Sequence, residues 1–270
     1  MTARLSQLTM ISEDHFALAR FYEGFFHMRP GGGQGPMDDV SIGDGHIGIA
    51  IKPRVAGHLA QLDHFAIAVD DLDGTLARIR EHHPTIGTLA NFAGAPAGAV
   101  ATYDPDGNLF VLTQPKCDGI ASDGPNTRRR IDHVALRVLH PGRVAEFYRM
   151  VFGWTEIEGP RSIQRNTYLS DGHATLVLIP WTLNDFEGTG ISARGLDHIG
   201  FRVESIASLK TEIDTAAVRN PRVHPSTSIL GKGKEGSVRL DMFRRTCPLG
   251  EHHLADPDGL LLDVIERPVS

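Results

Sequence analysis

The sequence has little of what marks several large classes of protein. Only two of its 270 residues are cysteine, Cys117 and Cys247, which argues against a disulfide scaffold and favours reduced thiols. Basic residues number 27 against 33 acidic ones, so the excess positive charge of a general nucleic-acid binder is missing. No apolar run approaches the roughly 20 residues that span a bilayer. The segment Met1–Ser12 mixes polar residues into its apolar ones, unlike a secretory signal. We therefore expect a cytoplasmic protein that binds neither nucleic acid nor membrane.

Histidine, by contrast, is abundant, and its positions follow an internal repeat. The chain holds 14 histidines, and histidine is both the commonest metal ligand and a proton carrier near neutral pH. One opening motif occurs three times, as Leu62–Val69 (LDHFAIAV), Ile131–Val138 (IDHVALRV) and Leu196–Val203 (LDHIGFRV). A fainter copy lies at Leu5–Ile11. It precedes a Phe-Tyr pair by the same number of residues as the copy at Ile131 does. Four units are therefore predicted, starting near residues 5, 62, 131 and 196.

Each unit has the residue pattern of a βαβββ element. The alternating, Val- and Ile-rich openings predict strands, and apolar residues at three- and four-residue steps, as over Val144–Phe152, predict a helix. Two Asp-Pro-Asp-Gly turns, Asp104–Gly107 and Asp256–Gly259, each precede a short apolar strand. We predict an α+β protein of four βαβββ units, paired into two open-barrel domains. These are residues 1–115 and 131–270, joined by a linker over residues 116–130 whose three arginines are expected to be solvated.

The strand period places two histidines on a polar face. Side chains alternate between the two faces of a strand, so His133 and His198 lie opposite the apolar residues that should face the helices. Two strands in equivalent phase then direct both imidazoles into one cleft. Glu266, at the end of the last predicted strand, is the third candidate, and two histidines with one carboxylate can form a facial metal triad. His64 holds the same register, but its counterparts are Gln7 and Gln114. The N-terminal domain is therefore expected to carry a degenerate site.

These features together resemble the vicinal oxygen chelate superfamily, which includes glyoxalases, bleomycin resistance proteins and dioxygenases. More narrowly, the order of motifs is similar to the two-domain type I extradiol ring-cleaving dioxygenases. The resemblance implies a metal-free N-terminal domain and, in the C-terminal domain, Fe(II), with Mn(II) or another divalent metal as alternatives, held by His133, His198 and Glu266. It implies a small-molecule substrate with vicinal oxygens, such as a catechol, together with O2. Because domains of this kind often associate, we also expect a homo-oligomer.

The reaction itself is left open between three alternatives. Glyoxalase-type isomerases use a fourth protein ligand, and the corresponding strand, Thr175–Trp181, has no carboxylate, which favours oxygen chemistry. The tyrosine and histidines that ring-cleaving relatives use are replaced, and the candidates at or beside those positions are His253, Arg244 and His173. They could supply a proton carrier and a cation near the metal. A metal-dependent lyase, isomerase or hydrolase is the first rival, and a metal-free binding protein is the second.

The fourth unit also has an insertion. About 18 more residues separate its opening histidine from its turn than in the second unit, and Gly231–Gly236 contains three glycines. This composition predicts a mobile hairpin tip that could cover the cleft.

Overall fold

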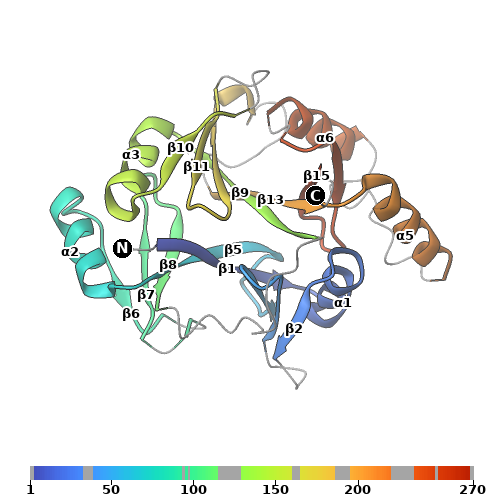
Figure 1. Cartoon of the computed structure of the whole chain (residues 1–270), viewed down its shortest axis with the longest axis horizontal. Coiled ribbons are helices and arrows are strands. Elements are labelled where there is room, and N and C mark those ends of the chain that lie inside the picture. The colour runs from blue at the N-terminus through green and yellow to red at the C-terminus, as the bar shows by residue number, and fades with distance from the viewer. Residues whose placement is uncertain are drawn as a thin grey trace.

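We describe the protein from a computed structural model, over residues 3–32, 39–92, 95–96, 98–114, 129–159, 165–185, 195–219, 234–246 and 249–267. The chain forms two sheets with helices packed against them (Figure 1). No helix in these ranges is long and apolar enough to cross a lipid bilayer.

The first sheet is built from the first two predicted units. The first unit comprises β1 (Ala3–Ser12), α1 (His15–Phe26), β2 (Arg29–Gly32), β3 (Val40–Gly43) and β4 (Gly48–Pro53). The second comprises β5 (Gln61–Val69), α2 (Leu72–His82), β6 (Leu89–Ala90), β7 (Val100–Tyr103) and β8 (Leu109–Thr113). The strand order is β2-β3-β4-β1-β5-β8-β7-β6, so the opening strands β1 and β5 pair at the centre, antiparallel to each other.

The second sheet repeats this plan with the last two units. The third unit comprises β9 (Arg130–Val138), α3 (Pro141–Phe152), β10 (Thr155–Ile157), β11 (Thr167–Ser170) and β12 (Thr175–Pro180). The fourth comprises β13 (Gly195–Val203), α5 (Ile206–Arg219), α6 (Lys234–Thr246), β14 (His252–Ala255) and β15 (Leu261–Glu266). The order is β10-β11-β12-β9-β13-β15-β14, again with the opening strands paired at the centre. The predicted α+β class with repeated units is confirmed, and neither sheet closes into a barrel.

The insertion of the fourth unit and the predicted linker differ in how far the structure describes them. The insertion of the fourth unit forms α6 from Lys234 onward rather than a hairpin tip, and residues 231–233 lie outside the described residues. Most of the predicted linker also lies outside them, so the division into domains at residues 115 and 131 stays a prediction.

The main core lies between the two sheets and includes the inner faces of α1 and α3. Alternation along the strands sends one set of side chains into this core, for example Val134 and Leu136 of β9 and Phe201 of β13. The ring of Phe26, from α1 of the first unit, lies 4.0 Å from the ring of Phe201 between centroids. Burial of these aromatic and aliphatic side chains, at about 25 cal/mol per Å² of apolar surface, stabilises both sheets as one structure.

The two Asp-Pro-Asp-Gly turns do more than reverse the chain. Gly107 and Gly259 adopt the left-handed backbone that the turn requires, with φ of 84° and 91°. The first aspartate of each turn is fully buried, and it accepts a hydrogen bond from a tyrosine on a helix of the other half of the chain. Tyr22 donates to Asp256 at 2.7 Å, and Tyr148 donates to Asp104 at 3.4 Å. These turns therefore connect the two sheets.

The second aspartate of the first turn extends this connection. Asp106 Oδ2 accepts hydrogen bonds from the backbone amides of Leu139 and His140, at 2.6 and 2.8 Å, directly before α3. It therefore satisfies donors at the start of a helix that belongs to the other half of the chain.

Within the arginine run of the predicted linker, the expectation of a solvated side chain is wrong for Arg129, and Arg128 lies outside the described residues. The side chain of Arg129 is completely buried, and its guanidinium contacts Glu204, Glu212 and the carbonyl oxygen of Phe25. Although burial by itself lowers the pKa of Arg129, the two carboxylates raise it above its usual value. This arginine ties α1 to the start of α5.

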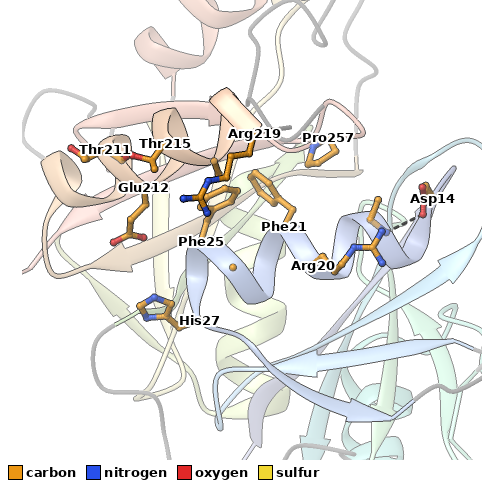
Figure 2. Close-up of a pocket in the computed structure, with 13 residues that line it drawn as sticks. Asp14, Arg20, Phe21, Phe25, His27, Thr211, Glu212, Thr215, Arg219 and Pro257 are labelled. Atoms are coloured by element: carbon orange, nitrogen blue, oxygen red, sulfur yellow. Dashed lines mark hydrogen bonds between the residues drawn. The ribbon is translucent and has the colours of Figure 1, made fainter. Parts of the chain in front are cut away.

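A groove of about 880 Å³ lies between α1 and α5 (Figure 2). Its lining includes Phe21 and Phe25 from α1 and Thr211 and Arg219 from α5. None of the histidines predicted to bind metal lines this groove.

Candidate metal centre

Two of the predicted ligands meet on the face of the second sheet that points away from the main core. His133 on β9 and His198 on β13 lie on neighbouring antiparallel strands, in a register that pairs His133 with Gly200 and His198 with Ala135. Their Nε2 atoms are 3.2 Å apart, and both side chains are buried. The structure therefore brings these two imidazoles together as the strand period predicted.

Gly200 makes room for this arrangement. A Cβ atom at Gly200 would lie 1.9 Å from Cε1 and 2.0 Å from Nδ1 of the His133 ring. Real Cβ contacts of this length do not occur, so a side chain here would force the imidazole to move. The small residue two positions after His198 is thus part of the site, a role that sequence reasoning missed.

The aspartate that precedes His198 in the repeated motif orients its ring. Asp197 Oδ2 lies 2.7 Å from Nδ1 of His198, and Arg137 of β9 binds the other carboxylate oxygen. Burial on its own would raise the pKa of Asp197, but Arg137 and His198 lower it far below its ordinary value, so the group is ionised. A carboxylate can only accept, so Nδ1 carries the proton and the lone pair of the neutral imidazole lies on Nε2.

The other half of the site repeats this pattern with the strands exchanged. Asp132 Oδ2 lies 3.5 Å from Nδ1 of His133, and its Oδ1 accepts a hydrogen bond from Arg202 of β13 at 2.9 Å. Each arginine of the opening motif therefore binds the aspartate of the opposite strand. The conjunction of Asp-His with an arginine four residues after the histidine is a signal that could have identified these partners from the sequence.

The third group of the cluster is Asp263 and not Glu266. One ligand atom each from His133, His198 and Asp263 can be chosen so that all three lie within 4.8 Å of one another. Asp263 Oδ2 lies 3.5 Å from Nε2 of His133, and its side chain is fully buried. The amide of Gly250 donates to this same oxygen at 2.8 Å.

Glu266 lies on the other side of the strand. Leu262 and Val264 of β15 are in the main core, and Glu266 shares their phase, while Asp263 has the opposite phase. The Oε2 atom of Glu266 accepts a hydrogen bond from the amide of Ile206 at 2.7 Å, at the start of α5. Its carboxylate therefore stabilises the N-terminus of a helix. The phase of β15 was readable in the sequence and would have favoured Asp263.

Of the three predicted catalytic partners, the structure brings only His253 to the cluster. Its Nε2 lies 3.2 Å from Oδ1 of Asp263, and its side chain is almost fully buried. The ring of His173, in the turn between β11 and β12, instead stacks on His46 at 5.1 Å between centroids. Arg244 lies on the exposed side of α6, 3.8 Å from Asp241.

The chemistry of this donor set fits a cation. Burial lowers the pKa of His198, so its imidazole is neutral, even though Asp197 opposes the shift. Its Nε2 lone pair points at a second buried imidazole nitrogen, beside a carboxylate. Oδ1 of Asp263 is also buried, and Nε2 of His253, a further imidazole nitrogen, lies 3.2 Å from it. Acceptor atoms brought this close together away from water need a proton or a cation between them. His133, His198 and Asp263 could hold a divalent metal ion.

At the corresponding place on the first sheet, the described residues form a different set of contacts. His64 keeps its own aspartate, with Nδ1 2.7 Å from Asp63, but its Nε2 lies 3.1 Å from the hydroxyl of Thr9. Val111 pairs with Ala66 in the register in which Asp263 pairs with Gly200, so an apolar side chain stands where the carboxylate would be. The loss of the N-terminal site stays a prediction.

Comparison with known proteins places this chain in a family. The sequence profile of the Glyoxalase/Bleomycin resistance protein/Dioxygenase superfamily matches residues 4–112 and again residues 130–264. The chain belongs to this superfamily. Each match covers one of the two sheets, so the family relationship accounts for the internal repeat that the sequence showed.

Solved structures of the superfamily share the fold at low sequence identity. The 2,3-dioxygenase LapB from Pseudomonas sp. KL28 is 15% identical with a TM-score of 0.64, over 100% of this chain and 94% of that one. An Mn(II)-bound glyoxalase from Novosphingobium aromaticivorans is 15% identical with a TM-score of 0.63, over 97% and 82%. A variant of 4-hydroxymandelate synthase from Streptomyces coelicolor is 14% identical with a TM-score of 0.60, over 100% and 95%. A search of the curated proteins found no match.

Proposed function

We propose that this superfamily member is a metal-dependent dioxygenase-like enzyme that acts with O2 on a small substrate bearing vicinal oxygens, such as a catechol. The metal, Fe(II) or alternatively Mn(II), would be held by His133, His198 and Asp263. When bound, such an ion acts as a Lewis acid toward oxygen atoms of the substrate. Asp263 replaces Glu266 in the ligand set that the sequence predicted.

One observation carries this proposal. Two imidazole Nε2 atoms converge with a carboxylate in a buried site, and Asp197 holds the proton of His198 on its other ring nitrogen, Nδ1. Two histidines and one carboxylate on one side of an ion leave its other positions open for a substrate and O2. The adjacent strand β12 supplies no fourth carboxylate, since its residues Thr175–Pro180 are apolar or neutral.

The remaining side chains position these ligands. Asp197 and Asp132, held by Arg137 and Arg202, would keep the two imidazoles with Nε2 toward the ion. His253 would hold a proton on Nε2 toward Oδ1 of Asp263, which leaves the other carboxylate oxygen for the ion. By donating this proton, His253 could act as a general acid near the substrate.

The test combines metal analysis with oxygen consumption. Protein purified without air is expected to contain one equivalent of iron or manganese and to consume O2 with members of a catechol panel. Asp263→Asn should lose the metal, because a neutral amide replaces the anionic ligand without changing the size of the side chain. Glu266→Gln serves as the matched control and should retain it. Stoichiometric metal without O2 consumption would remove the ring-cleavage proposal and leave the metal site, whereas retention of metal by Asp263→Asn would remove the site as we propose it.

A metal-dependent lyase, isomerase or hydrolase is the second candidate. It is favoured by His253, a proton-carrying group beside the cluster where ring-cleaving relatives are expected to have a tyrosine. Product formation from a candidate substrate in the absence of O2 would support this reaction class over oxygen chemistry.

A further inference from the structure

Helix α6 is attached to the second sheet by few apolar side chains. It follows α5 and precedes β14 along the chain, and the described residues of the second unit form no corresponding helix (Figure 1). Leu240 and Phe243, one helical turn apart, are buried against Ala135 and Val177, with Tyr168 and Ile179 completing the contact. This cluster lies on the same face of the sheet as His133 and His198, outside the main core. The exposed side of the helix carries Ser237, Asp241, Arg244 and Arg245.

The ring of Phe243 closes the metal centre. Its centroid lies 4.6 Å from the ring of His198 and 4.9 Å from the ring of His253, with interplanar angles of 73° and 78°. These are edge-to-face contacts of the kind that aromatic side chains favour. With Phe243 in place, His133, His198 and Asp263 are each at most 1% exposed to solvent. A substrate cannot reach the three groups in this conformation.

The first sheet provides a contrast. There Phe92 lies edge-on to His64, at 5.5 Å and 86°, above a floor made of Ala66, Ala101 and Val111. Among the described residues that face carries no set of three ligand groups, so a ring that fills it blocks no metal site. On the second sheet the same kind of ring covers a site with three ligand groups, and it comes from an inserted, mostly polar helix.

We propose that α6 is a movable plug over the three-ligand cluster and that Phe243 determines which molecules reach it. Resting on the proposed function, the inference is that the substrate takes the place of the Phe243 ring. The vacated space is bounded by Ala135, Tyr168 and Val177 on one side and by His198 and His253 on the other. It fits a flat ring of about the size of a phenyl group, apolar where it meets the aliphatic side chains and carrying its oxygens toward the histidines.

Because a local structure attached by few buried contacts opens more easily than the whole protein unfolds, the plug can be tested through metal release. Protein loaded with Zn²⁺ is mixed with excess 4-(2-pyridylazo)resorcinol, and the rate of Zn²⁺ transfer is followed by absorbance. Phe243→Ala is expected to increase this rate about 10- to 100-fold, the factor that corresponds to the transfer free energy of a buried aromatic side chain. Phe243→Leu, which retains much of the apolar contact, should give a smaller increase.

The matched control is Val238→Ala on the same helix. Val238 is 43% exposed and takes part in neither ring contact with the histidines, so its variant should release Zn²⁺ at the wild-type rate. Equal rates for wild type and both Phe243 variants would overturn the plug. So would an equal increase in Val238→Ala, or loss of Zn²⁺ binding in Phe243→Leu with the fold intact by circular dichroism. Failure of the wild-type protein to bind Zn²⁺ would instead refute the proposed metal site itself.

Discussion

Replacing Asp256 by Asn is expected to remove a pH-dependent loss of stability from this protein. The carboxylate of Asp256 is completely buried between the two sheets. Its Oδ1 accepts hydrogen bonds from the amides of Asp258 and Leu260, at 3.0 and 2.9 Å, and its Oδ2 accepts one from the hydroxyl of Tyr22. Asn can present Oδ1 to the same amides and its NH2 group to the hydroxyl oxygen of Tyr22, so the variant keeps these contacts without the charge.

The size of the effect follows from the pKa of this group. Burial raises the pKa of Asp256 to about 7, even though the Tyr22 hydroxyl and the turn amides oppose the shift. In the unfolded chain an aspartate has a pKa of about 3.9. The folded state therefore retains a proton that the unfolded state has lost, and stability falls as the pH rises from about 4 to 7. The full loss is about 4 kcal/mol, of which roughly 2–3 kcal/mol lies between pH 5 and pH 8.

The measurement is urea unfolding of wild type and Asp256→Asn at pH 5 and pH 8. The difference between the two unfolding free energies should grow in favour of the variant by roughly 2–3 kcal/mol from the lower to the higher pH. Subtracting the two proteins removes the contribution of groups that titrate in both. A constant difference at the two pH values would refute the assignment of a buried, neutral Asp256.

Three further outcomes are expected. Gly200→Ala should weaken Zn²⁺ binding strongly, because the added Cβ would displace the ring of His133. In the same titration the control Gly142→Ala should bind Zn²⁺ like wild type, because a Cβ at that position meets open space. Arg129→Ala should lower the free energy of unfolding by about 1–3 kcal/mol, since the variant loses the hydrogen bonds of the buried guanidinium while the two carboxylates left behind are partly exposed to water. A change below about 0.5 kcal/mol would contradict its role. Glu266→Ala should lower the free energy of unfolding by about 1 kcal/mol, measured by thermal or urea unfolding, because α5 loses the side chain that caps it. The Zn²⁺ affinity of this variant should be unchanged. A large loss of affinity would return Glu266 to the ligand set.

The repeat made much of this fold accessible from the sequence. The register of the Asp-His motif predicted that His133 and His198 lie on one face of adjacent strands, and the structure pairs those strands with the Nε2 atoms 3.2 Å apart. This succeeded because the two-residue period of a strand is a local property. The same period applied to β15 would have separated Asp263 from Glu266, since Leu262 and Val264 share the phase of Glu266.

Other features depended on contacts between distant segments. Arg129 has the sequence context of a solvated linker, yet it is buried, because the fourth unit brings Glu204 and Glu212 to it. Arg244 and His173 were placed at the site by resemblance alone, and the structure directs them to Asp241 and His46.

By itself the sequence determined the four units, the α+β class and the phase of the two histidines, because hydrophobic periodicity and turn chemistry act over a few neighbouring residues. Only the tertiary structure decided that Arg129 is buried and that Phe243 of an inserted helix covers those histidines. Those outcomes depend on how separate strands and a helix approach one another in space, which is set by the packing of the whole chain and not by the spacing of residues along it.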